Sequence, residues 1–220
     1  MARWSVQENR PPLSRDAIVD VATELIEREG LSSFTMRSLG RELGVSAMAI
    51  YGYFESRGDV LTAVLERFMA TIDTDPVPGE RWDDTLRRIM TSIYVEEMAH
   101  PELASIEITP GAGNAGLARH TEKIVALHLD QGIPVPVLKR AWAMVDAFLA
   151  GFTDNAIEER AIANLPGGAH APSSEHDLAL WEEIVMDAHS DEAFACGIEI
   201  IIEGIRGLAA PDPCDWRTPE

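Results

Sequence analysis

The sequence predicts an all-α fold, on three observations. Apolar residues recur with the helical period of 3.6 along most of the 220-residue chain. Strand-like alternation between turn dipeptides is missing from the sequence. Glycine, proline, serine and threonine stand where such helices would begin or end. With 46% hydrophobic and 25% charged residues, the composition is that of a globular chain with a core to bury.

The first two helices have clear capping signals. Ser14 is the expected N-cap of a helix over 15–29, and Gly30 is its expected left-handed C-cap. Thr35 is expected to cap a short second helix. The apolar stripe of the first helix is Ile18, Val21, Ala22, Leu25 and Ile26.

Two further helices follow a tight turn. After the Gly-Val-Ser turn at 44–46, Ser46 is the expected cap of a third helix over about 47–53. Ser56 opens a fourth helix, 57–73, in a sequence resembling a capping box. The prolines and glycine at 76–79 must end it, because a helix interior tolerates neither well.

Beyond this break the helical stripes are longer and are separated by glycine or proline. We expect a loop over 164–175, and the Ile-Ile-Ile run at 200–202 is assigned to a helix because its neighbours keep the helical period. The expected helices are 80–99, 102–108, 114–131, 136–162, 176–188 and 191–209.

The charge is strongly acidic and unevenly distributed. The net charge is −19, but residues 1–70 contribute only −2 and residues 71–220 contribute −17. Taken alone, the total opposes binding to nucleic acid or anionic membranes through bulk electrostatics. No apolar leader follows Met1 and no apolar stretch could span a bilayer, so we expect a cytoplasmic protein without a membrane partner.

A helix-turn-helix pattern occupies the N-terminal part. Leu39 and Leu43 would pack the first of its two helices, Gly44 would relieve the turn, and Val45 would fill the corner between the helices. The second helix of such a pair enters the major groove of DNA.

The residues around this pattern resemble the DNA-binding domain of the Tet repressor family. The resemblance rests on the Gly-x-x-x-Phe-Thr corner at 30–35, on Thr-Met-Arg-Ser-Leu at 35–39, and on Gly-Val-Ser-Ala-Met-Ala-Ile-Tyr-Gly-Tyr-Phe at 44–54 with Glu-Ser-Arg after it. It covers residues 14–72. It implies hydroxyl, arginine and tyrosine contacts to phosphates, and apolar contacts to base edges that suit thymine methyl groups. The candidate DNA-binding residues are Thr35, Arg37, Ser46, Ala47, Met48, Tyr51, Gly52, Tyr53 and Arg57.

The acidic remainder resembles a Tet-repressor-type regulatory domain. The resemblance rests on Phe-Ala-Cys-Gly-Ile-Glu-Ile-Ile-Ile-Glu-Gly-Ile at 194–205, on Trp-x-x-x-Leu at 82–86 and on His-Pro-Glu-Leu at 100–103. It implies a homodimer through helices 136–162 and 191–209. The expected organisation is a flexible arm at 1–13, a helix-turn-helix domain at 14–56, a linking helix at 57–73 and a helical regulatory and dimerisation domain at 74–220.

The regulatory part is expected to bind a small, hydrophobic effector. His100 precedes Pro101, and the resemblance implies a histidine near this corner that can bind the metal of a drug chelate, although a histidine there also suits a helix end. His120 and His128 lie too far apart for metal chelation on one helix, so no metal and no cofactor is expected. The candidate effector-binding residues are Trp82, Met90, Tyr94, His100, His120, Thr121, Trp142, Asp146, Phe148 and Asn155.

These observations predict a transcriptional regulator rather than an enzyme, because no catalytic fingerprint occurs in the sequence. We expect a repressor that binds a palindromic operator as a dimer and that an effector releases by moving helix 57–73. Two alternatives stay open. The regulator could activate transcription, or the chain could be a helical dimeric small-molecule-binding or enzymatic module whose helix-turn-helix is only structural.

Overall fold

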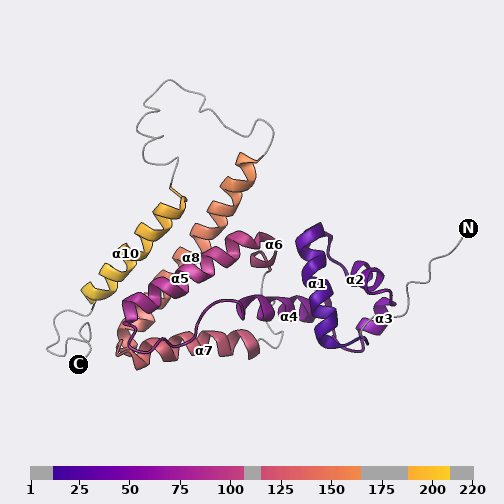
Figure 1. The fold of residues 1–220 in the computed structure, drawn as a ribbon, viewed down its shortest axis with the longest axis horizontal. Coiled ribbons are helices and arrows are strands. Elements are labelled where there is room, and N and C mark those ends of the chain that lie inside the picture. Colours follow the sequence, from indigo (N-terminus) through magenta and orange to yellow (C-terminus); the bar gives the residue numbers. More distant parts are fainter. Residues whose placement is uncertain (1–11, 107–114, 165–187, 209–220) are drawn as a thin grey trace, which may run out of the picture. The chain divides into compact units, whose positions relative to one another are not determined.

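The computed structural model describes residues 12–106, 115–164 and 188–208 (Figure 1). These residues are helical with turns between the helices and contain no strand, which confirms the predicted all-α fold. The expected loop over 164–175 and the helix over 176–188 lie almost entirely outside the described residues, as does most of the N-terminal arm. No helix in the described part of the chain has the length and apolar character needed to cross a membrane.

The described residues divide into two units. Unit 1 comprises those within Met1–Ala70 and His100–Ala118, and unit 2 those within Thr71–Ala99 and Arg119–Glu220. The helices of unit 1 are α1 (Arg15–Glu29), the 3₁₀ helix η1 (Leu31–Ser33), α2 (Met36–Leu43), α3 (Ala47–Ile50), α4 (Arg57–Met69) and α6 (Pro101–Ala104). Unit 2 contains α5 (Trp82–Ala99), most of α7 (Ala115–Asp130), α8 (Val135–Ala163) and α10 (Asp191–Leu208).

The predicted N-caps of unit 1 are confirmed. The Ser14 hydroxyl accepts a hydrogen bond from the Ala17 N–H, and the Ser56 hydroxyl caps α4 in the same way. Thr35 and Ser38 cap each other's backbone N–H in a capping box at α2. These side-chain bonds satisfy backbone donors that have no partner inside the helix, so they fix where each helix begins.

Within residues 14–73, three helix ends differ from the sequence prediction. Gly30 has φ +83° and ψ 149°, a combination that essentially only glycine adopts. It therefore ends α1, but not in the expected left-handed helical conformation. Helix α3 ends at Ile50, because the N–H groups of residues 52 and 53 bond to carbonyls only three residues back. Helix α4 ends at Met69, four residues before the expected end at 73.

The core of unit 1 draws on two separate parts of the chain. Side chains of α1, α2, α3 and α4 pack together around Ile18, Leu39 and Val60. Leu103 and Ile106, from α6 and the residues after it, are buried in the same cluster. Helix α6 packs against both α1 and α4, so the structural unit that contains the helix-turn-helix includes residues beyond position 99.

In unit 2, α5, α8 and α10 pack against one another around an apolar core (Figure 1). Each contributes large apolar side chains to it, and the chain before α8 adds Ile133. The main buried members are Trp82, Leu86, Met90, Tyr94, Ile133, Val137, Ala141, Phe152, Ala156, Phe194, Ile198, Ile201, Ile202 and Ile205.

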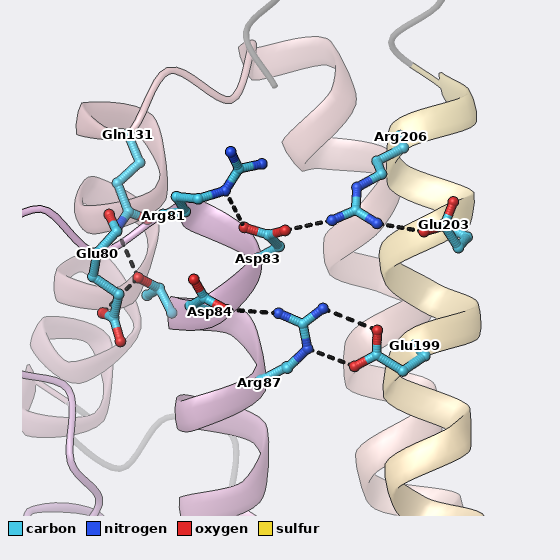
Figure 2. A network of polar contacts seen from close by, with 10 residues as sticks. Glu80, Arg81, Asp83, Asp84, Arg87, Gln131, Glu199, Glu203 and Arg206 are labelled. Atoms are coloured by element: carbon cyan, nitrogen blue, oxygen red, sulfur yellow. Dashed lines mark hydrogen bonds and ion pairs between the residues drawn. The ribbon is translucent and has the colours of Figure 1, made fainter. Parts of the chain in front are cut away.

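Ion pairs also join α5 to α10 (Figure 2). The Arg87 guanidinium forms a double contact with the Glu199 carboxylate, with 2.9 Å between Arg87 Nη2 and Glu199 Oε2. Asp83, only 5% exposed, accepts from Arg81 Nε at 3.1 Å and also pairs with Arg206. Because these contacts lie at several levels along both helices, they fix the register of α10 on α5.

A second polar cluster joins α5 to α7. The Gln131 amide donates to the Thr85 hydroxyl at 2.6 Å and to the Glu80 carbonyl at 3.1 Å. Thr85 in turn donates to the Glu80 carboxylate, which Arg88 also pairs with. The buried imidazole of His128 lies beside this cluster, and burial lowers the pKa of His128, so the ring is neutral at pH 7.

Candidate DNA-binding surface and effector site

Helix α3 presents a mostly apolar surface to solvent. Met48 is 75% exposed, and Tyr51 and Gly52 are exposed beside it, while Ala47 is half-buried. Ile50 points the other way and is buried in the core of unit 1. The helix is therefore anchored by one face, and the opposite face is free to enter a groove.

The two candidate hydroxyls at helix N-termini are both engaged in capping. Ser46 Oγ accepts from the Ala49 N–H at 3.3 Å, and Thr35 Oγ1 accepts from the Ser38 N–H at 3.0 Å. Both residues are exposed, so the Ser46 hydroxyl proton remains available to a phosphate oxygen. Arg37 is exposed on α2, and its guanidinium can reach outward.

Tyr53 and Arg57 have intramolecular contacts that the sequence did not indicate. The Tyr53 hydroxyl donates to the Leu13 carbonyl at 2.8 Å, which ties the start of α1 to the end of the helix-turn-helix. Arg57 Nε donates to the Phe34 carbonyl at 3.0 Å, and Nη2 donates to the Leu31 carbonyl at 3.3 Å. Both side chains therefore brace unit 1, and only their remaining polar atoms can contact DNA.

Two residues of this surface were missed by sequence reasoning. A Cβ on Gly40 would lie 3.0 Å from the Val45 carbonyl oxygen, so the absence of a side chain there lets α2 pack closely against the turn. A glycine within an otherwise good helix was the available signal. The Arg15 guanidinium lies 4.0 Å from the centre of the Phe54 ring and donates to the Tyr53 carbonyl. That contact joins positions far apart in the sequence, so no sequence pattern could have predicted it.

The candidate effector residues are spread over both units and over all degrees of burial. Nine lie in unit 2, where Trp82, Met90 and Tyr94 are buried, Trp142, Phe148 and His120 are half-buried, and Thr121, Asp146 and Asn155 are exposed. Burial lowers the pKa of His120, and its Nε2 has no hydrogen-bond partner among the described residues. Trp142 lines an apolar hollow of about 250 Å³ between α7 and α8.

His100 belongs to unit 1. Its Nδ1 lies 2.5 Å from the Glu27 carboxylate on α1, and its ring meets the edge of Phe68 on α4. Two residues on, the Glu102 carboxylate accepts a hydrogen bond from the Leu31 N–H at 2.7 Å. His100 lies at a helix end, between α5 and α6, and these contacts attach α6 to α1 and η1.

An aromatic cluster lies between α5, α8 and α10. Tyr94 stacks on Phe194 with 4.0 Å between ring centres, and Phe152 and Phe148 pack within 5.5 Å of the same Phe194 ring. The Tyr94 hydroxyl donates to Asp191 at 2.7 Å. Burial, helped by this carboxylate, raises the pKa of Tyr94 to about 12, so the phenol stays protonated.

Helices α8 and α10 each carry exposed apolar residues and glycines in the described part of the chain. Ile200 is 73% exposed, and Met144 and Leu208 are also exposed. A Cβ on Gly151 or Gly204 would meet open space. Exposed apolar residues on two long helices are typical of a subunit interface.

The comparisons with known proteins agree over most of the chain. Residues 18–64 match the family described as "Bacterial regulatory proteins, tetR family", and residues 75–208 match "Tetracyclin repressor-like, C-terminal domain". The HTH-type transcriptional repressor DrrR1 of Streptomyces coeruleorubidus is 24% identical over 91% of this chain and 80% of its own length. The class C tetracycline repressor protein of Escherichia coli is 26% identical over 89% and 92%, respectively.

Solved structures share the fold. ActR of Streptomyces coelicolor, in complex with actinorhodin, superposes with a TM-score of 0.70 at 24% identity, covering 91% of this chain and all of ActR. BioQ with its double-stranded DNA operator superposes with a TM-score of 0.61 at 19% identity, covering 88% and 98%.

Proposed function

The chain belongs to the tetR family of bacterial regulatory proteins, and we propose that it is a repressor released from a palindromic operator by a small-molecule effector. As a member of this family it is a DNA-binding transcriptional regulator with a helix-turn-helix domain and a ligand-binding domain.

The exposed face of α3 carries the proposal. Met48 projects from a helix whose opposite side, at Ile50, is buried, and its large apolar side chain is therefore available to an apolar group of a partner. In the major groove that partner is a thymine methyl group. Thr35, Arg37, Ser46, Tyr51, Tyr53 and Arg57 surround this face as phosphate contacts, and Ala47 and Gly52 allow the backbone to approach the bases.

Two copies of this surface are needed to read a palindrome. One short recognition helix spans too few base pairs for specificity, whereas a twofold dimer reads two half-sites about one helical turn apart. The exposed apolar residues of α8 and α10, with Met144 and Ile200 among them, supply the proposed contact between protomers. Gly151 and Gly204 on these helices permit close approach of the helices.

The named relatives support both halves of the proposal. DrrR1 and the class C tetracycline protein are repressors by name, ActR is described with actinorhodin bound, and BioQ is described with its operator. By the same inference the chain acts on DNA in the cytoplasm, through binding and not through catalysis.

Release would pass through the junction between α5 and α6. Helix α5 carries Tyr94, and α6 follows it after His100 and packs on α1 and α4. A shift of the α5 end caused by an effector would pull on α6, and Glu102 and His100 would transmit that movement to α1. The α4 helix would then change its position, and the two recognition helices would no longer match the half-sites.

A gel-shift with the palindrome upstream of the chain's own gene tests the proposal. The full-length protein should prefer this DNA to random DNA, with an affinity that falls as salt rises. Met48→Glu places a negative charge on the exposed face of α3 and should abolish binding without changing the melting temperature. Val135→Glu, an equally drastic change at another exposed apolar position, serves as the matched control and should bind normally. Equal binding by both variants would refute the assignment of α3.

A further inference from the structure

The rim of the aromatic cluster in unit 2 is acidic. Asp191 bonds to Tyr94, Glu97 lies three residues after Tyr94 on α5, and Asp154 follows Phe152 and Thr153 on α8. Glu159, one turn further along α8, pairs with His189 at 2.7 Å, and the His189 ring meets the edge of Phe152. The positive charge of Arg160 partly opposes the rise in the pKa of Tyr94, so Arg160 also lies near this cluster. Four carboxylates thus border the cluster, against one arginine and one histidine.

Among these four carboxylates only Glu159 has a basic partner in the described residues, and Glu97 is the one that is not exposed. It is half-buried, and burial raises the pKa of its carboxyl. The described groups that act on it are the Thr153 hydroxyl and the like charge of Asp154, neither of which neutralises it. A carboxylate in this position is costly in the unliganded protein, and a cation would relieve the cost.

Thr153 gives independent evidence that this place receives a ligand. Its side chain is 2% exposed, and its Oγ1 forms no hydrogen bond with any described residue, although it lies close enough to Glu97 to lower the pKa of that carboxyl. Buried hydroxyls nearly always have a partner, because leaving one unmet costs about 1–3 kcal/mol. Phe152, the preceding residue, is a member of the aromatic cluster, so the hydroxyl, the carboxylate and the rings meet at one place.

We propose that the effector of this repressor is a hydrophobic organic cation whose positive charge lies between Glu97 and the Tyr94–Phe152 rings, with Thr153 as an additional polar contact. This inference rests on the proposed function, since it names the chemical class of the molecule that releases the operator. Aromatic faces attract cations, and a carboxylate screened from water attracts them more strongly. The charge of −17 on residues 71–220 also concentrates cations near this part of the molecule.

A pair of ions of matched size and opposite charge tests the inference. Tetraphenylphosphonium and tetraphenylborate have the same shape and similar hydrophobicity, so calorimetric titration of the full-length protein with each isolates the sign of the charge. We expect tetraphenylphosphonium to bind at least about tenfold more tightly, and Glu97→Gln to remove most of that preference. Glu122→Gln removes the same charge from an exposed position on α7 and should leave the preference unchanged.

The melting temperature of Glu97→Gln shows whether the variant is folded, and Glu97→Asp provides a second variant that keeps the charge and should keep part of the preference. Equal binding of the two ions, or an unchanged preference in Glu97→Gln, would overturn the inference and indicate a neutral effector. The operator gel-shift separates this from the proposed function. Loss of charge selectivity with intact operator binding refutes only the cation site, whereas selective binding by a protein that ignores the operator refutes the repressor.

Discussion

Replacing Asp83 by Asn tests whether the ion pairs between α5 and α10 hold unit 2 together. The change keeps the shape of the side chain but removes the charge that faces Arg81 and Arg206 (Figure 2). Because Asp83 is almost fully buried, Arg81 and Arg206 in the variant face a neutral amide where the natural protein has a carboxylate shielded from water.

The expected magnitude follows from how exposed the partners are. Breaking a fully buried ion pair costs about 3–5 kcal/mol, because an unpaired charge stays inside the protein. Arg206 keeps its contact with Glu203, and Arg81 reaches solvent, so neither is left without compensation. We therefore expect Asp83→Asn to lower the free energy of unfolding by about 2–3 kcal/mol at pH 7.

The assay is urea unfolding at one fixed protein concentration, because the stability of a dimer depends on concentration. Asp84→Asn is the matched control: Asp84 is exposed, and its pairing with Arg87 should contribute about 0–1 kcal/mol. A loss in Asp83→Asn no larger than in the control would refute the argument that burial gives this ion pair its strength.

The dependence on pH provides a second check of the same variant. Burial opposes ionisation of Asp83, but Arg81 and Arg206 outweigh it, so the pKa of Asp83 is lowered on folding. A carboxyl with a lowered pKa stabilises the fold above its unfolded pKa, about 3.9, and loses that contribution as the pH falls through the folded pKa. The difference between the natural protein and Asp83→Asn should be constant from pH 7 to pH 5 and shrink below about pH 4. A difference that stays the same at acid pH would contradict this assignment.

Three further substitutions have defined outcomes. Gly40→Ala gains about 1 kcal/mol of helix propensity, but the new Cβ would meet backbone atoms of the turn before α3. Thermal melting should therefore show a net loss of stability of about 1–2 kcal/mol. A rise in the melting temperature would show that the turn can move to accommodate the methyl group. Glu102→Gln weakens the charged hydrogen bond to the Leu31 N–H and should cost about 1–2 kcal/mol in urea unfolding, and no cost would mean that this exposed contact does not hold α6. Tyr51→Ala should weaken operator binding in a gel-shift with an unchanged melting temperature, because the side chain is exposed; unchanged affinity would remove it from the DNA contacts.

What the sequence could predict was local. The caps at Ser14, Thr35 and Ser56 follow from residues three positions apart, so the start of each helix was visible without knowledge of the fold. The ion pair of Asp83 with Arg206 and the contact of His100 with Glu27 join residues 123 and 73 positions apart. Nothing in the spacing of the sequence encodes such pairings, because they depend on how the helices pack.

The candidate sites divide in the same way. The exposed face of α3 could be predicted because the helix-turn-helix pattern fixes which side is buried. The aromatic cluster could be predicted only in part: Tyr94 and Phe148 were candidates, but Glu97 and Thr153 were not. A charged residue on a helix is ordinarily exposed to water, and only the packing of α5 on α8 shows that Glu97 is half-buried.

The position of α6 also has a consequence for how this protein could evolve or be divided. Leu103 and Ile106 complete the core that α1 and α4 begin, so a fragment ending at the Pro/Gly break would expose that core to water. Recombination at this break could therefore not join a complete DNA-binding domain to another regulatory domain, because residues 100–106 would be left behind. A gene fusion that preserves DNA binding must therefore include the residues after position 99. A truncation at the Pro/Gly break would not leave a folded DNA-binding domain that represses without the regulatory part.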